Sequence, residues 1–177
     1  MDGDVATNVS ARAQHGTHLK ALGELVVTVD HIAIAVQDLS AGIAWYEGLG
    51  FTLIEQRITE GEHSAMLSAV MRAGRAIIVL LQGTSPQSQV SRFIDHFGPG
   101  VQHIALEVSD LDLALAKVRE VGGEVDARTL DEGIRQVFLR RDPGSGVRVE
   151  LIERRGGTFT DTSVRQLFLA FERQDLF

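Results

Sequence analysis

Two histidines occur in nearly identical apolar segments of the chain. His31 lies in VDHIAIAV (residues 29–36) and His103 lies in VQHIALEV (residues 101–108). A single histidine in an apolar strand is usually a hydrogen-bonded core residue, but two histidines in matched positions indicate a shared role. Imidazole nitrogens that face one cavity can bind a divalent metal ion, so the pair points to metal chemistry.

We expect a third ligand from an acidic side chain on a strand that enters the same cavity. Glu150 in VRVELIE fits this role, because a buried carboxylate is costly unless it is paired or bound to a metal. Two alternatives stay open, a salt bridge from Glu150 to Arg148, and Glu153 as the ligand at a solvated strand end. Two histidines and one carboxylate form a facial triad that suits non-haem Fe(II) binding both substrate and O₂, although Co, Mn or Zn can occupy such a site.

The remaining histidines and the composition narrow the function classes. His15 and His18 lie in the polar N-terminal segment, and His96 lies between the repeats. We expect His63 at an exposed strand edge, with a place beside the metal ligands or the substrate as the alternative. The chain contains no cysteine, which excludes disulfides and thiolate ligands. Its net charge of −7 argues against nucleic acid and anionic membrane surfaces as partners. We expect a cytoplasmic protein, because the chain shows neither an apolar run of membrane-spanning length nor a signal-peptide core.

The elements that must position these residues form an internal repeat. Residues 29–50 align without gaps with residues 101–122, at an offset of 72 residues between His31 and His103. Each copy reads as a strand with alternating faces, followed by a helix that an aspartate (Asp38 or Asp110) caps and a glycine ends. Three strand-like runs follow each helix. The sequence therefore predicts an α+β fold of two βαβββ modules.

We predict one domain over residues 29–177. An N-terminal arm (1–28) precedes this domain. The domain consists of module one (29–84), a linker with a short helix (85–100), module two (101–154) and a C-terminal segment that forms a helix (155–177). Two βαβββ modules related by a pseudo-twofold axis bring their first strands together. Both imidazoles would then face one cavity.

Longer stretches carry a family resemblance. HIAIAV and VQHIALEV resemble the vicinal-oxygen-chelate (glyoxalase-like) superfamily of paired βαβββ metal enzymes. SQVSRFIDHFGPGVQHIAL (88–106) is similar to the metal-bearing C-terminal domain of 4-hydroxyphenylpyruvate dioxygenase and hydroxymandelate synthase. ELIERRGGTFTDTSVRQLFLAFERQ (150–174) is similar to that family's final strand, glycine turn and lid helix. The resemblance covers residues 29–175 and implies one half-barrel domain, the metal domain of a family that is normally two-domain, with a C-terminal lid helix.

The resemblance implies a non-haem Fe(II) dioxygenase that uses O₂ to decarboxylate and hydroxylate a 2-oxo acid. It places the metal ligands at His31, His103 and Glu150, the set already favoured by the residues themselves. It implies that the substrate is contacted by Ser64, Gln89, Gln102, Phe159, Val164 and Phe168. Phe168 as a core residue and Gln89 as a helix cap are the alternatives.

The chain also departs from the family pattern. Val164 stands where the family's lid helix begins with phenylalanine, and one strand ahead of the glutamate strand is missing. A pocket without that aromatic wall should grip a phenol ring less well. We therefore expect a 2-oxo acid other than 4-hydroxyphenylpyruvate, such as an aliphatic acid or a biosynthetic intermediate.

Two other function classes stay open. An epimerase similar to methylmalonyl-CoA epimerase shares the paired module and the ligand set, and Glu60 or Glu62 could act as its base. That family adds a glutamine ligand, and spacing from His103 puts Ile77 there, which favours the dioxygenase. A small-molecule-binding resistance protein of the superfamily is disfavoured because all three ligands are retained. Since single-domain relatives often pair, a homodimer is also open.

Overall fold

Each copy of the repeat folds as a strand, a helix and three further strands, in a computed structural model that describes residues 22–130 and 133–177. The first copy consists of β1 (Val26–Ala35), α2 (Leu39–Gly48), β2 (Thr52–Glu60), β3 (Ala65–Ala73) and β4 (Ala76–Gly83). The second copy consists of β5 (Gly100–Val108), α4 (Leu111–Glu120), β6 (Val125–Leu130), β7 (Ile134–Leu139) and β8 (Arg148–Arg154). Helix α3 (Gln89–Phe97) joins the copies, and α5 (Asp161–Arg173) follows the second copy. The predicted α+β fold of two βαβββ modules with a C-terminal helix is confirmed.

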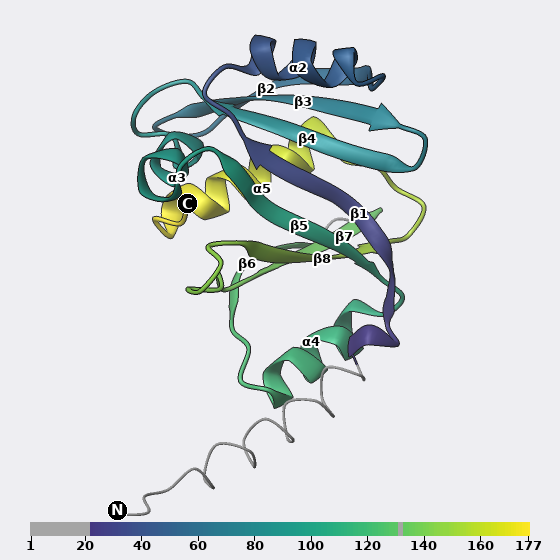
Figure 1. The fold of residues 1–177 in the computed structure, drawn as a ribbon. Coiled ribbons are helices and arrows are strands. Elements are labelled where there is room, and N and C mark those ends of the chain that lie inside the picture. The colour runs from purple at the N-terminus through teal and green to yellow at the C-terminus, as the bar shows by residue number, and fades with distance from the viewer. Residues whose placement is uncertain (1–21, 131–132) are drawn as a thin grey trace, which may run out of the picture.

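All the strands join one open sheet with the order β2-β3-β4-β1-β5-β8-β7-β6. Within each copy the first strand runs parallel to the last, β1 beside β4 and β5 beside β8. The two copies meet where β1 and β5 pair antiparallel. Figure 1 shows the sheet curving around α5, with α2 and α4 on its outer side. The curved inner face is therefore roofed by α5, and the two first strands lie at its centre.

The two outer helices are fixed to the sheet by equivalent interactions. The Asp38 carboxylate accepts from Ala41 N at 2.9 Å, and the Asp110 carboxylate accepts from Leu113 N at 2.9 Å. Helix α2 packs Leu39 and Ile43 against β3 and β4, and α4 makes the matching cluster from Leu111, Ala114, Leu115, Val118, Val137 and Leu151. Each module thus has its own apolar core on the outer side of the sheet.

The start of β1 differs from the sequence prediction, and the start of α5 refines it. Strand β1 begins at Val26, three residues before the predicted start, because the alternating run from Val26 continues the pairing with β5 as far as Val108. Residues 26–28 of the predicted arm therefore belong to the sheet, and residues 1–21, with His15 and His18, lie outside the described residues. Helix α5 begins at Asp161, where Thr160 and Ser163 form a capping box. Within the described ranges, no helix is long and apolar enough to cross a membrane.

We expect Asp38→Ala and Asp110→Ala each to lower the free energy of unfolding by about 1 kcal/mol, because each removes the N-cap of a helix. Ser40→Ala, an exposed change one position inside the first turn of α2, is the control and should change stability by less than about 0.5 kcal/mol. Urea denaturation of the four proteins measures the effect. Cap variants as stable as the control would contradict this account of the helix starts.

Candidate metal centre

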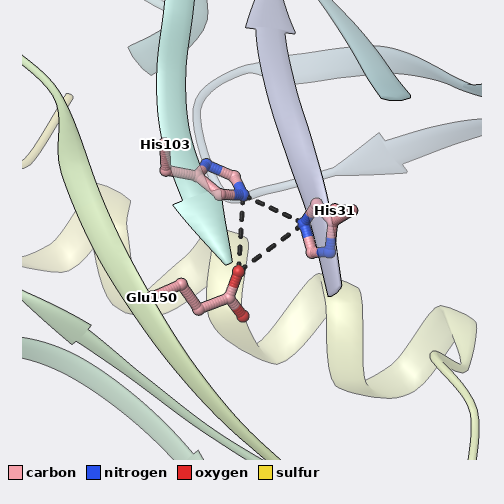
Figure 2. Close-up of side chains that lie close together, drawn as sticks. All are labelled: His31, His103 and Glu150. Carbon is pink, nitrogen blue, oxygen red and sulfur yellow. Dashed lines mark hydrogen bonds and ion pairs between the residues drawn. The ribbon is translucent and has the colours of Figure 1, made fainter. Parts of the chain in front are cut away.

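Three side chains of types that can bind a metal ion converge among the described residues: His31 from β1, His103 from β5 and Glu150 from β8 (Figure 2). His31 Nε2 lies 3.2 Å from His103 Nε2 and 3.6 Å from Glu150 Oε2. His103 Nε2 lies 3.4 Å from the same oxygen. Neighbouring ligands at about 2.1 Å from one ion lie about 3 Å apart when they are at right angles. The spacing therefore fits three ligands on one face of a metal ion.

Strand register explains why these side chains meet. In the β1–β5 pair His31 is opposite Ala105 and His103 is opposite Ala33. In the parallel β5–β8 pair Ala105 is also aligned with Glu150. Ala33 and Ala105 are fully buried and small, so the three larger side chains have room to turn toward one another.

The residue before each histidine fixes its ring. His31 Nδ1 lies 2.9 Å from Asp30 Oδ1, and His103 Nδ1 contacts Gln102 Oε1. Both oxygens accept, so the partners assign the proton to Nδ1 and leave a lone pair on each Nε2. Two imidazole lone pairs and the Glu150 carboxyl group then face one point. With Glu150 ionised, all three groups offer lone pairs, which a cation between them would bind.

Burial strongly perturbs the ionisation of Glu150 and His103. Glu150 is 1% exposed, and within the described part of the chain its Oε1 has no hydrogen-bond partner. Burial raises the pKa of Glu150 well above its usual value, and the charge of Asp30 adds to this. Burial lowers the pKa of His103 well below its usual value, which keeps the ring neutral. A divalent cation would relieve both penalties, so the residues present fit a metal ion.

The charge around His31 is organised by Asp30, a residue that sequence reasoning missed. Burial alone would raise the pKa of Asp30, but hydrogen bonds from His31 and Arg154 outweigh it and hold the value at about 2. The signal was available in the repeat, because Asp30 and Gln102 occupy the same position before the two histidines. Partners of this kind set the tautomer and orientation of a ligating histidine.

The alternatives to Glu150 as ligand do not form. Arg148 pairs with Asp126 at 2.8 Å rather than with Glu150. Glu153 is bound by Arg135 at 2.8 Å, so it is engaged away from the triad. This end of β8 carries an ion-pair network that includes the exposed Arg155, so Glu153 lies at a partly solvated strand end. Of the six histidines of the chain, His63 and His96 are exposed and lie apart from the triad.

A cavity of about 130 Å³ opens beside the triad. Its apolar walls are formed by Met66, Val70, Val79, Leu81, Phe138, Phe159, Val164 and Leu167. Beyond the triad, its polar lining consists of Glu55, Arg57 and Ser68. A second cavity of about 60 Å³ shares His103 and part of these walls, and it extends to Gln89, Gln102, Phe168 and Phe171. The candidate substrate space is therefore mostly apolar.

Five of the six predicted substrate-contacting residues line these cavities. Phe159 and Val164 line the larger one, and Gln89, Gln102, Val164 and Phe168 line the smaller one. The Phe159 ring packs edge-to-face on His31, with centroids 5.7 Å apart. Gln89 Nε2 donates to Phe168 O at 3.4 Å, so it contacts α5 in addition to lining the cavity.

The sixth predicted residue, Ser64, is not among the residues that line these two cavities. It precedes β3 and donates to Glu172 Oε1 of α5 at 2.6 Å, whereas Ser68 on β3 lines the cavity. The β2–β3 turn ends with the bond from Gly61 N to Ser64 O, which leaves Ser64 beside α5 at the sheet end. Ser64 therefore binds α5, and Ser68 is the serine that can contact a substrate in the cavity.

Strand pairing also changes which residue occupies the place of the epimerase family's glutamine ligand. In the first module Val79 on β4 is aligned with Ala33, and in the second module Glu150 on β8 is aligned with Ala105. Val79, not Ile77, is therefore the pseudo-symmetric counterpart of the glutamate. Val79 lines the cavity and cannot bind a metal, which leaves the triad without a fourth protein ligand at this place. Glu62 pairs with Arg173 at 2.6 Å, and beyond the triad Glu55 is the acidic residue among those lining the cavity.

Comparison with known proteins shows the family of the chain. Residues 28–151 match the Glyoxalase/Bleomycin resistance protein/Dioxygenase superfamily. The chain belongs to this superfamily. The resemblance drawn from the sequence motifs is thereby confirmed at the level of the vicinal-oxygen-chelate fold.

Relatives with two different activities appear within the superfamily. The chain is 35% identical over 100 residues to 4-hydroxyphenylpyruvate dioxygenase of Hordeum vulgare, a match covering 51% of this chain and 23% of that protein. It is 28% identical over 129 residues to the mitochondrial methylmalonyl-CoA epimerase of Homo sapiens, covering 70% of this chain and 72% of that protein. The chain thus spans less than a quarter of the dioxygenase.

Solved structures that resemble this chain also include proteins of both kinds. A mutant of 4-hydroxymandelate synthase from Streptomyces coelicolor superposes with a TM-score of 0.72 at 22% identity, covering 83% of this chain and 54% of that one. Methylmalonyl-CoA epimerase from Mycobacterium tuberculosis superposes with a TM-score of 0.61 at 31% identity, covering 73% of this chain and 89% of that one. The likeness to the synthase shows the fold.

We expect Glu150→Gln to stabilise the metal-free protein by about 1 to 3 kcal/mol at high pH. Because folding raises the pKa of Glu150, the folded state holds its proton more tightly than the unfolded state. Wild-type stability therefore falls as the pH rises above the usual glutamate range, until the raised pKa is passed. The glutamine variant lacks this loss, so the stability difference grows with pH.

Urea denaturation of the two metal-free proteins between about pH 5 and pH 9 measures this difference. Glu153→Gln, on the same strand but bound by Arg135, is the matched control. A difference between wild type and Glu150→Gln that stays constant with pH would contradict a buried carboxylate that lacks its ion.

Proposed function

We propose that this chain is the metal-bearing part of a non-haem Fe(II) dioxygenase of the 4-hydroxyphenylpyruvate dioxygenase-like type. It would oxidatively decarboxylate and hydroxylate a 2-oxo acid. The observation that carries the proposal is the triad of His31, His103 and Glu150, converging from three strands onto an apolar cavity. Three protein ligands on one face leave room for a chelating acid and for O₂, which is the arrangement typical of Fe(II) oxygenases.

The roles of the chain's own residues follow from the geometry. Bound Fe(II) would supply the O₂ chemistry that side chains lack. His31 and His103 would hold it with their Nε2 atoms, and Glu150 would offset part of its charge. Phe159 and Leu167 form walls that exclude water. The Ser68 hydroxyl, a neutral polar group in these walls, would orient the substrate by a hydrogen bond.

The walls also favour an apolar substrate side chain. Most of the lining of the 130 Å³ cavity is aliphatic or aromatic. An apolar cavity of about 150 Å³ is large enough to bind benzene. A 2-oxo acid with a hydrocarbon side chain, rather than a phenol, therefore suits this site.

An epimerase is the second candidate, and specific observations favour it. The epimerase from Mycobacterium tuberculosis is covered over 89% of its length at 31% identity. Glu55 places a carboxylate at the cavity wall, where it could take a proton from a substrate α-carbon, and a metal ion held by the triad would supply electrostatic stabilisation. Against this, Glu55 is engaged by Arg57, and the place matching Glu150 is taken by Val79.

Anaerobic loading with Fe(II), followed by a panel of 2-oxo acids, tests the proposed chemistry. We expect a visible charge-transfer band with at least one acid, because a 2-oxo acid chelates the metal through two oxygens. The band should bleach when O₂ is admitted, with release of carbon dioxide. His103→Ala should abolish the band, and His63→Ala, an exposed histidine outside the triad, should leave it unchanged.

The same samples separate the two candidates. Proton exchange at the α-carbon of an acyl-CoA, with no band from any 2-oxo acid, would assign the site to the epimerase. Loss of that exchange in Glu55→Gln would then identify the base.

The substrate preference is a separate prediction. We expect kcat/KM for phenylpyruvate and 4-methyl-2-oxopentanoate to exceed that for 4-hydroxyphenylpyruvate by about 10- to 100-fold, since most of the cavity wall is aliphatic or aromatic. Val79→Asn adds a polar group to the cavity wall and should narrow the preference. Ile77→Asn, on the same strand outside the cavity lining, is the control. Oxygen uptake measures the rates. A higher kcat/KM for 4-hydroxyphenylpyruvate would contradict the proposed preference for an apolar substrate side chain.

A further inference from the structure

We propose that Arg154 is a positioning residue, which orients His31 and also holds the segment that leads into α5 against the same imidazole ring. This inference rests on the proposed function, because it assumes that His31 binds a metal ion. It concerns a residue at the end of β8 that lies outside the triad and outside the cavity lining.

The first route from Arg154 to His31 runs through Asp30. Arg154 Nε lies 2.6 Å from Asp30 Oδ2, and Arg154 Nη2 lies 3.0 Å from Asp30 Oδ1. Asp30 Oδ1 also accepts from His31 Nδ1 at 2.9 Å. A two-pronged guanidinium–carboxylate pair fixes the plane of the carboxylate, and through it the plane of the ring. Arg154 thereby sets the direction in which His31 Nε2 points.

The second route runs through Phe159. The Arg154 guanidinium carbon lies 5.2 Å from the centre of the Phe159 ring, and Arg154 Nη1 donates to Gly157 O at 3.3 Å. Phe159 in turn packs edge-to-face on His31. Residue 159 immediately precedes Thr160, the N-cap of α5. One guanidinium thus contacts both the carboxylate that orients His31 and the aromatic ring that covers it.

The path of this segment leaves little freedom for an alternative arrangement. Gly157 N donates to Gly133 O at 3.0 Å, and a Cβ at Gly157 would come within 2.6 Å of the Gly133 backbone. The chain therefore passes close to the start of β7 before it reaches Phe159. The guanidinium fills the space between this pinned segment and β1.

The second histidine has no equivalent arrangement. The partner of His103 Nδ1 is the neutral amide of Gln102, and the nearby Arg141 donates to the Gln102 backbone oxygen instead of its side chain. Asp30 is charged and buried, so it needs a cation to remain in place. The device is therefore specific to His31, and it links β1 to β8 across the intervening β5.

A coupling between two sites acts in both directions. If Arg154 holds Phe159 against His31, then metal binding at His31 also stabilises the segment over residues 156–160. Loss of the guanidinium should weaken the metal site and uncouple it from this segment. A residue that served packing alone would change stability without changing that coupling.

The test compares Arg154→Met with Arg155→Met in the full chain. Methionine keeps most of the apolar stem, and Arg155 is an exposed neighbour that pairs with Glu153. Titration with Co(II) should show an affinity about 10- to 100-fold weaker for Arg154→Met and unchanged for Arg155→Met. Arg154→Lys keeps the charge without the two-pronged contact and should give an intermediate affinity.

Hydrogen exchange gives a readout that is independent of activity. In wild type, Co(II) should slow exchange of the amides over residues 156–164, and in Arg154→Met this slowing should disappear. Should Arg154→Met fail to fold, as judged by circular dichroism, Asp30→Asn replaces it, with the same loss of affinity and protection expected. Asparagine keeps an acceptor for His31 but loses the charge that binds Arg154.

The outcomes separate the two proposals. If wild type binds Co(II) and Arg154→Met (or Asp30→Asn) binds it as tightly with the same slowing of exchange, the role of Arg154 is overturned while the metal site stands. If wild type binds neither Co(II) nor another divalent ion, the proposed function itself fails.

Discussion

The antiparallel pairing of β1 with β5 is the interaction on which the rest of the site depends. It sets His31 opposite Ala105 and His103 opposite Ala33, so both imidazoles rise from the same face of adjacent strands. The neighbouring β8 then brings Glu150 level with Ala105. No single module contains this group, because its members come from both halves of the sheet. The donor set is therefore assembled only when the two halves have folded together.

Assembling these ligands costs stability, and the surrounding residues offset part of the cost. Glu150 is buried with an oxygen that has no partner in the described residues, and His103 is held neutral by burial. Charged neighbours are paired instead, Asp30 with Arg154 and Asp126 with Arg148. The protein thus pairs the charges around the three converging side chains, while Glu150 Oε1 at their centre has no hydrogen-bond partner among the described residues.

Repetition made much of this architecture predictable from the chain alone. The two copies reveal the strand, the capped helix and the matched histidines, because these depend on local periodicity. Ile77 and the start of β1 were misassigned because each depends on pairing between strands that are far apart in the sequence, and the place of Ser64 depends on the β2–β3 turn. A turn that shifts the alignment by a few residues moves a different side chain into the cavity, as Ser68 and Val79 show. Arg154 and Asp30 lie 124 residues apart, and periodicity carries no signal of their contact.

Val79 and Glu150 occupy equivalent places in the two halves, yet one is apolar and the other is acidic. Two identical half-length chains, paired as β1 pairs with β5, would necessarily carry the same side chain at both places. Such a symmetric ancestor would enclose its ion between either four ligands or two. An odd number of candidate ligands therefore requires the two halves to differ in sequence, as Val79 and Glu150 do. Divergence of the two copies would thus leave one side of a bound ion free of protein ligands and open to solvent-borne reactants.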